Sequence, residues 1–411
     1  MPHHGEAVAA AVPYVTSLPT YTVYREDATY YAVNNSTGAI DFTGADPAVV
    51  VQACLTAGGA GTVVGMREAI YVALTGVAAT ANNQGIYGMG EGTYWDATAL
   101  LTGVHAFTIS GFTGCELRNF AIETEAGGGK TCHCVFIEDG ADNFHLIDIT
   151  IIASDKDGIH IEGTTITQGH IHRCHIQGAD EQGILVDMGV GDYMYRLHIE
   201  DCDIGNTGWG SINFMSCAGN WFCEVIDNVI YNSGGVGIGV SDFEYSTLRG
   251  NICVLGASQG MQITDTDHAQ VTDNILYQNR HHGIYLYGAN YCTVEGNICL
   301  ENDFLNSGTR DGIYLQTSNK NLILGNQLQE NDRWGIMVND DSDWNKVSNN
   351  LTEGNTAGSI NVNGAPCVGN QVEFNQVEEG APVDTGTFTR SYGNFDPSAD
   401  GFVGDKGAPP W

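Results

Sequence analysis

The chain has few cations: 15 Lys and Arg residues stand against 49 Asp and Glu residues, which gives a formal net charge of -34 over 411 residues. A surface this acidic repels nucleic acids and anionic membranes, so we expect neither as a partner. No run of about 18 apolar residues occurs, which excludes a membrane-spanning helix. The first ten residues, MPHHGEAVAA, lack a basic segment followed by an apolar core, so we expect no signal peptide in this sequence.

What the chain has instead is an internal repeat. An Asn opens each unit, and successive Asn residues are 23, 23, 23, 29, 24 and 20 positions apart: Asn228, Asn251, Asn274, Asn297, Asn326, Asn350 and Asn370. A Gly, mostly followed by Ile, repeats with nearly the same period: Gly158, Gly183, Gly210, Gly237, Gly260, Gly283, Gly312, Gly335 and Gly358. Two markers that share a period near 23 indicate stacked supersecondary units.

The repeats lack the regular Leu spacing and the helical segment of leucine-rich repeats. They consist of short alternating runs such as GIHIEG, GIYLYG and GIMVND, a pattern typical of β-strands, with Gly and Asn at the corners. We therefore predict an all-β chain folded as a right-handed parallel β-helix with coils of about 23 residues. Coils stack about 4.8 Å apart, so equivalent side chains form ladders. We expect Asn251, Asn274 and Asn297 to form one such ladder at a turn.

The residue two positions after six of these Asn residues, all except Asn350, is expected to point into the core. This row reads Ile230, Cys253, Leu276, Cys299, Leu328 and Val372. Cys253 and Cys299 then lie about two coils apart, too far for a disulfide, and should be buried thiols. Cys174 and Cys202 fall in adjacent coils and are the best candidates for a bridge. Neither the segment KTCHCVF at 130–136 nor HIHRCHI at 170–176 has the convergent spacing of a metal site, so we predict no metal ligands.

The first hundred residues differ from the repeats. Residues 46–57 are predicted to form a short amphipathic helix, with Asp46 as its N-cap and Pro47 in its first turn. Such a helix would cover the open end of the solenoid, where unpaired strand edges would otherwise be exposed. We divide the chain into N-terminal strands and capping helix (1–60), the β-helix (61–375) and a C-terminal tail (376–411).

The order of N-terminal strands, capping helix, GTVVG strand and GMGEGT turn resembles the start of pectate-lyase-like β-helix proteins. The resemblance covers residues 20–375. This superfamily includes polysaccharide lyases, glycoside hydrolases, uronan epimerases and phage tailspike depolymerases. The resemblance implies the fold and a polysaccharide as the binding partner, and its motifs specify the fold far better than the chemistry.

Two outward-facing regions carry candidate chemistry. The first contains ASDKDGIHIEG and, one coil later, ADEQGILVDMG. Here Asp157, Asp180, Glu181 and His160 are the candidate catalytic residues, because hydrolysis of a glycoside needs two nearby carboxylates. Lys156 and Asp187 are candidate substrate-binding residues beside them. The same carboxylates could bind Ca²⁺ as a cofactor, or could simply solvate a turn.

The first region also resembles polygalacturonases. DKDG at 155–158, DE at 180–181 and GWG at 208–210 match that family's motif intervals, which implies catalytic roles for Asp157, Asp180 and Glu181. Trp209 stands where the family has His, and no R-I-K segment follows, so the match does not identify a substrate.

The second region contains NRHHGIYLYG and TRDGIYLQ. Its basic and aromatic side chains are candidate substrate-binding residues, since Tyr contacts sugar rings and Arg pairs with carboxylates or sulfates. They are Arg280, His281, His282, Tyr285, Tyr287, Arg310 and Tyr314. The alternative is a Tyr ladder that only stabilises a sheet.

Two functions remain open at this stage. The chain is either a carbohydrate-active enzyme, a hydrolase or lyase acting on a long polysaccharide, or a noncatalytic solenoid such as an adhesin, a surface-layer component or a glycan-binding fibre. Both functions predict an extracellular, virion or cell-surface location. Converging carboxylates or bases in an elongated groove would favour the enzyme, and ladders without a cleft would favour the noncatalytic solenoid.

Overall fold

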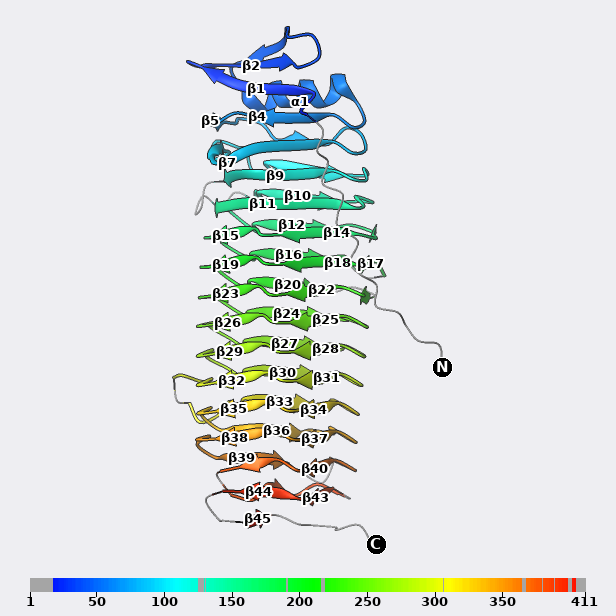
Figure 1. The fold of residues 1–411 in the computed structure, drawn as a ribbon, viewed down its shortest axis with the longest axis vertical. Coiled ribbons are helices and arrows are strands. Elements are labelled where there is room, and N and C mark those ends of the chain that lie inside the picture. The colour runs from blue at the N-terminus through cyan, green and yellow to red at the C-terminus, as the bar shows by residue number, and fades with distance from the viewer. Residues whose placement is uncertain are drawn as a thin grey trace.

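The computed structural model describes residues 18–124, 129, 131–189, 191–215, 219–305, 307–363, 367–378, 380–387, 389–397 and 401–403. These residues form an elongated solenoid whose coils stack along the long axis (Figure 1). The single helix of the described part lies near the N-terminal end. No helix in these ranges is long and apolar enough to cross a membrane.

One face of the solenoid is a 13-stranded parallel sheet, to which each coil adds one strand. Its strands are β6 (Val77–Ala78), β8 (Phe107–Ser110), β10 (Val135–Glu138), β12 (Ile159–Glu162), β16 (Ile184–Asp187), β20 (Ile212–Met215), β24 (Ile238–Ser241), β27 (Met261–Thr264), β30 (Ile284–Tyr287), β33 (Ile313–Gln316), β36 (Trp334–Asn339), β39 (Gly358–Val362) and β42 (Val383–Asp384).

The remaining faces belong to a 29-stranded sheet and a short three-stranded sheet. The large sheet contains β1 (Tyr21–Glu26), β2 (Thr29–Asn34), β3 (Ile40–Gly44), β4 (Val63–Met66), β5 (Ala69–Val72), β7 (Gly85–Asp96), β9 (Glu116–Glu123), β11 (Phe144–Ala153), β14 (Gly169–His172), β15 (His175–Gln177), β18 (Leu197–Glu200), β19 (Asp203–Gly205), β22 (Glu224–Ile226), β23 (Val229–Tyr231), β25 (Thr247–Arg249), β26 (Ile252–Val254), β28 (Gln270–Thr272), β29 (Ile275–Tyr277), β31 (Thr293–Glu295), β32 (Ile298–Leu300), β34 (Leu322–Leu324), β35 (Gln327–Gln329), β37 (Lys346–Ser348), β38 (Leu351–Glu353), β40 (Gln371–Glu373), β41 (Gln376–Val377), β43 (Arg390–Tyr392), β44 (Asn394–Asp396) and β45 (Gly401–Val403). The short sheet contains β13 (Thr165–Ile166), β17 (Tyr193–Tyr195) and β21 (Gly219–Trp221).

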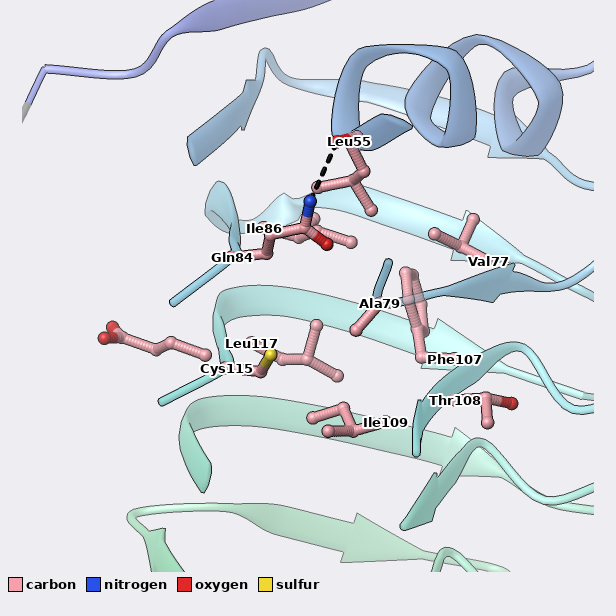
Figure 2. Close-up of a pocket in the computed structure, with 11 residues that line it drawn as sticks. Leu55, Val77, Ala79, Gln84, Ile86, Phe107, Thr108, Ile109, Cys115 and Leu117 are labelled. Carbon is pink, nitrogen blue, oxygen red and sulfur yellow. Dashed lines mark hydrogen bonds between the residues drawn. The ribbon is translucent and has the colours of Figure 1, made fainter. Parts of the chain in front are cut away.

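The N-terminal end is closed as the sequence predicted. Helix α1 (Pro47–Gly58) begins after Asp46, whose carboxylate accepts a hydrogen bond from the Ala48 N–H at 2.9 Å. The amide of Gln84 donates to the Leu55 carbonyl at 2.8 Å, which ties the last turn of the helix to the coil below it (Figure 2). Between helix and coil remains an apolar cavity of only about 20 Å³. The helix therefore seals the core.

The pairing of strands in successive coils confirms the predicted repeat. Gly158, Gly183 and Gly283 each precede a strand of the 13-stranded sheet, and Ile159 pairs with Ile184 in the next coil. Right-handed crossovers are the rule for parallel strands in one sheet. The all-β, right-handed parallel β-helix is thus confirmed. Strands β43 and β44 pair in parallel with β40 and β41, so coils continue beyond residue 375. The three-part division of the chain stays a prediction.

A buried amide ladder follows the turn predicted for it. The Asn274 side chain accepts hydrogen bonds from the Asn251 N–H at 2.9 Å and the Asn251 amide at 3.0 Å. Its own amide donates to the Leu248 carbonyl at 3.0 Å and to Asn297 at 2.9 Å. At each of these corners the chain leaves its strand. The Asn side chain there supplies the hydrogen-bond partner that a neighbouring backbone group would otherwise supply.

The predicted series of ladder asparagines was wrong at its last residue, Asn370. Asn350 donates to Asn375, at 2.9 Å, and not to Asn370. Asn370 instead continues a second ladder from Asn345, with a bond of 3.1 Å from the Asn345 amide. The interval of 20 residues therefore joined two different corners of the coil. The inward row therefore continues from Leu328 to Thr352, which is buried, whereas Val372, predicted to be the next member, pairs with Val347 in another row.

All cysteines of the described residues are buried, and no disulfide joins any two of them. Burial raises the pKa of the Cys253 and Cys299 thiols, as expected for small core residues. The bridge considered between Cys174 and Cys202 is not formed.

The ladder generates a prediction for Asn274→Ala. Removing the amide leaves the Asn251 N–H and the Leu248 carbonyl without their partner inside the protein. We expect the free energy of unfolding to fall by about 2 kcal/mol or more. Asn363→Ala is the matched control, because its amide bonds Asn339 at the surface, and it should change stability by less than about 0.5 kcal/mol. Equal losses for the two variants in denaturant unfolding would contradict the structural role of the ladder.

Candidate active site

The candidate site begins with a row of side chains that lies two residues before successive strands of the 13-stranded sheet. Each side chain accepts a backbone N–H from the next coil. The Nδ1 atom of His133 accepts the Asp157 N–H at 3.3 Å, and Asp157 Oδ1 accepts the Gln182 N–H at 2.9 Å. Like the asparagine ladder, this row supplies hydrogen-bond acceptors at a corner. Unlike it, the row contains groups that can hold or move a proton.

Asp157 is fully buried, and its second oxygen faces two imidazoles. The Nδ1 atom of His160 lies 2.7 Å from Asp157 Oδ2, and His133 Nδ1 lies 3.3 Å from the same oxygen. Because His133 Nδ1 accepts the Asp157 N–H, the short bond is best satisfied by a proton on His160 Nδ1. The carboxylate therefore fixes both the tautomer and the orientation of the His160 ring.

The other nitrogen of His160 points toward the surface. Its Nε2 atom lies 3.1 Å from Glu162 Oε2, and the Glu162 side chain is 47% exposed. With Nδ1 protonated, two acceptor atoms would meet here unless a proton lies between them. A proton on either atom would complete this contact close to solvent. We call Asp157, His160 and Glu162 the relay.

The histidines behind the relay are neutral at neutral pH. Burial, followed by repulsion from His160, lowers the pKa of His133 to about 2 and that of His105 to about 4. Phe136 stacks on the His105 ring with 4.2 Å between ring centroids. The relay thus has an uncharged and partly apolar wall on one side, which strengthens the interaction between its own charges.

A second carboxylate stands beside the relay. Asp187 is in register with Glu162 on the neighbouring strand, and both are half-buried. Neighbouring strands lie about 4.8 Å apart, so the two side chains start from adjacent positions on the same face. The strand pairing therefore places Glu162 next to Asp187, a pair that the sequence analysis did not select.

The remaining residues of the first predicted region occupy the corner. Lys156 is half-buried, and its carbonyl accepts the Glu181 N–H at 3.1 Å. Asp180 is exposed and Glu181 is half-buried, whereas Asp157 lies in the interior. The structure brings Asp157 and His160 together. Catalytic roles for Asp180 and Glu181 stay predictions.

The second predicted region repeats the same local design. His282 is buried, and its Nδ1 accepts the Asp311 N–H at 3.0 Å and lies 3.4 Å from Asp311 Oδ2. Here, however, the Asp311 carboxylate is held by Arg333, whose Nε donates to it at 2.8 Å. The guanidinium takes the place that a second histidine has in the relay. This Asp is therefore neutralised by a fixed cation and is not coupled to a surface imidazole.

His282, Tyr285 and Tyr314 form a stack that we call the tyrosine platform. Ring centroids are 4.7 Å apart between His282 and Tyr314 and 5.4 Å between Tyr285 and Tyr314. Burial raises the pKa of Tyr285 to about 12, so its hydroxyl remains protonated. Because the rings cover one another's faces, the platform offers mainly ring edges and hydroxyls to a ligand.

Four further predicted residues surround the platform. Tyr287 is 42% exposed and lies 6.2 Å from Tyr285 between ring centroids. Arg280 is exposed, and Arg310 and His281 are half-buried. Burial, and then the charge of Arg310, lowers the pKa of His281. The aromatic and basic strip expected here is present, but its use by a ligand stays a prediction.

Sequence reasoning missed His133, Glu162, Asp311 and Arg333 as site residues. A signal for two of them exists: DGI occurs at 157–159 and at 311–313, and in both cases a His stands one coil earlier, at 133 and 282. The contribution of Glu162 and Arg333 depends on side-chain direction, which the repeat does not reveal.

His133, Asp157 and His160 are also the one group in the described part of the chain that could hold a metal ion. Their ligand atoms all lie within 4.8 Å of one another, and all three residues are buried. The histidines of HIHRCHI do not converge: His170 stacks between His145 and His198, while His172 contacts Asp201 at 3.1 Å.

Comparison with solved structures finds the same fold at low sequence identity. A point mutant of the periplasmic alginate epimerase AlgG matches with 11% identity over 81% of this chain and 77% of that chain, with a TM-score of 0.50. The A-module of a mannuronan C-5 epimerase from Azotobacter vinelandii matches with 15% identity over 89% and 96%, also with a TM-score of 0.50. DFA-IIIase from Arthrobacter chlorophenolicus without its lid matches with 15% identity over 84% and 95%, with a TM-score of 0.54. These matches show the parallel β-helix fold that the repeats predicted.

No curated protein matches the chain. A family model does: that of NosD, described as a periplasmic copper-binding protein, matches residues 181–396, which is more than half of the chain. The relay and its metal-binding group lie before this segment. The chain belongs to the NosD family.

Proposed function

We propose that the protein is a carbohydrate-active β-helix protein that cleaves a long polysaccharide on the outward face of the 13-stranded sheet, as a glycoside hydrolase or a polysaccharide lyase. The observation that carries this proposal is the relay: a buried Asp157 holds His160, which contacts Glu162 at the surface. The structural relatives named above include epimerases and other enzymes of carbohydrates, which is consistent with the proposal.

The relay suits the proton transfers that either reaction needs. In a hydrolase, a proton on His160 or Glu162 goes to the glycosidic oxygen, and Asp187 is the second carboxylate that assists water or forms a glycosyl intermediate. In a lyase, His160 or Glu162 in its deprotonated form removes the proton beside a uronate carboxylate, and a second group protonates the leaving oxygen. Asp157 stabilises the imidazolium in both cases and does not itself change protonation.

Substrate binding is assigned to the rest of the face. Lys156 beside the relay and Arg280 and Arg310 beside the tyrosine platform are cations on a strongly acidic protein. They would bind carboxylates or hydroxyls of a glycan, while Tyr287 offers an exposed ring. We also propose a periplasmic or extracellular location, as the family's description suggests. The noncatalytic alternative, a glycan-binding or structural solenoid, lacks any use for a buried proton relay.

Replacing Asp157 by Asn tests the relay. The variant keeps the shape of the side chain and an oxygen that can accept the Gln182 N–H, but it cannot stabilise a charged His160. Turnover of the cleaved polysaccharide should fall by about two orders of magnitude or more. Reducing-end release and absorbance of unsaturated products, measured on a polysaccharide panel, report hydrolase and lyase activity separately. His160→Gln should lose turnover to the same extent.

Two further variants are compared with Asp157→Asn and His160→Gln. Asp273→Asn, at an exposed corner with a φ of 57° that Asn tolerates, should keep full turnover and melting temperature. Asp180→Asn decides between the relay and the polygalacturonase-like assignment, which requires a loss there. If Asp157→Asn and His160→Gln fold and retain turnover, the relay is not catalytic. If the wild type binds glycans and cleaves none, the noncatalytic solenoid is correct.

A second function, copper binding, is favoured by the family and by the metal-binding group. Two imidazoles and one carboxylate form a donor set that Cu²⁺ accepts, so the residues fit this metal chemically. His133, Asp157 and His160 would hold the ion. Copper would supply Lewis acidity or one-electron chemistry at this place. Binding requires that His160 Nδ1 lose its proton, so copper and the relay use the same residues in different states.

Copper titration followed by electron paramagnetic resonance tests whether these three residues bind copper. If the group binds copper, the wild type should give a Cu²⁺ spectrum with nitrogen hyperfine coupling, and His133→Asn and His160→Asn should abolish it. His172→Asn should leave the spectrum unchanged, because His172 lies on another face and bonds Asp201. A spectrum that survives in His160→Asn would show that copper binds elsewhere.

A further inference from the structure

The face that carries the relay and the tyrosine platform is hollowed between them. A cavity of about 290 Å³ opens over β20, β24 and β27, three consecutive strands of the 13-stranded sheet. Its wall is uncharged and combines amides and hydroxyls with apolar side chains, among them Phe214, Val236 and Val240. The lining residues used below are Asn213, Met215, Gly239, Ser241, Gln262 and Thr264.

The hollow exists because the outward ladder contains one residue without a side chain. In register along this ladder stand Leu185, Asn213, Gly239, Gln262 and Tyr285. The backbone conformation at position 239 does not require glycine, since the φ angle of Gly239 lies outside the left-handed region. A β-carbon there would lie 2.6 Å from Asn213 Oδ1, a contact that a small rotation of that amide relieves. The glycine therefore provides space and not a special conformation, as expected where a ligand approaches a strand closely.

The polar groups around Gly239 are suited to sugar hydroxyls. The amide of Asn213 makes no hydrogen bond to another described residue, so it has both donors and acceptors to offer. Gln262 donates one hydrogen bond to Thr264 at 3.2 Å and retains its carbonyl oxygen as an acceptor. None of the lining residues is a cation that could pair with a carboxylate. The wall recognises a neutral, hydroxyl-rich group.

The position of the hollow links the two predicted regions. From β12 to β30 there are five strand steps, or about 24 Å along the axis. Figure 1 shows these strands stacked along the long axis of the molecule. The hollow lies in the middle of this distance. A glycan that reaches both the relay and the platform must pass over it.

We propose that the hollow at Gly239 is a binding subsite for a neutral sugar unit, and that it makes the protein selective for glycan chains long enough to span the relay and the tyrosine platform. This inference rests on the proposed function and adds the substrate's length and the charge of its central unit. Asn213 and Gln262 bind the hydroxyls of that unit, and Gly239 admits its ring.

Gly239→Leu fills the hollow without backbone strain and tests the proposal. The probes are glucan, mannan and polygalacturonate oligosaccharides from disaccharide to octasaccharide, with binding measured by calorimetry. For the wild type, affinity for a neutral series should rise with chain length until the chain spans the hollow. In Gly239→Leu the longest chains should bind about tenfold more weakly or worse, equivalent to about 1.4 kcal/mol, while disaccharides bind as they do to the wild type.

Asn361→Leu is the matched control. It adds the same side chain to the same outward ladder, in register with Met337 and beyond the platform, so long chains should bind it normally. Melting temperatures of both variants near that of the wild type confirm folding. If Gly239→Leu binds long neutral chains as well as the wild type does, the hollow is not a subsite, and the proposed function stands. If the wild type binds no glycan of any length, the proposed function and the subsite both fail.

Discussion

The structure depends on one constraint: at every corner the backbone groups must find a hydrogen-bond partner within the protein, in the same way in each successive coil. Coils about 4.8 Å apart leave no room for water between them, so a corner without an internal partner would carry unpaired polar groups in the core. The asparagine ladders meet this constraint with one residue type. At another corner the backbone N–H groups pair directly with carbonyls of the next coil, and bulky residues stand there in the left-handed conformation, at Phe222, Tyr245 and His268. There the stacking of neighbouring rings, with centroids 4.7 Å apart between Tyr245 and His268, offsets the backbone cost.

The candidate site is a variation of this structural rule. His133 and Asp157 accept backbone N–H groups just as the ladder asparagines do, so their presence costs the fold little. What differs is the second atom of each group, which remains available for chemistry. In the relay that atom holds His160, and near the platform both oxygens of Asp311 hold Arg333. One scaffold position thus produces a proton-transfer site in one part of the solenoid and a fixed ion pair in another.

The sequence predicts the parts of the fold that repeat. The period, the register of Gly158 with Gly183 and the capping helix after Asp46 all follow from spacing and local preferences, and the structure confirms them. Asn370 was assigned to the wrong corner because two asparagine ladders have the same residue and nearly the same interval. Spacing cannot separate corners of one coil when both use the same chemistry.

The site was predictable only in part, for a related reason. The ladder placed His160 outward, but it did not separate Asp157, which lies two residues before its strand and is fully buried, from Asp180, which lies four residues before the next strand and is exposed. The residues two positions before these strands, such as His133, Asp157 and Gln182, are all buried, so burial follows the exact place in the corner, which the spacing did not identify. The partnership of His160 with Glu162, two residues apart on one strand, is decided by side-chain rotation.

The central claim is that the relay, the hollow and the platform form one elongated glycan site on a single face. Crystallography of the Asp157→Asn variant, soaked with the neutral oligosaccharide that binds it most tightly, tests this claim most directly. The account predicts continuous density along the outward face of the 13-stranded sheet, with one sugar above Gly239 and the chain ends near His160 and Tyr287. Density on the face of the 29-stranded sheet, or across the coils instead of along them, would contradict it.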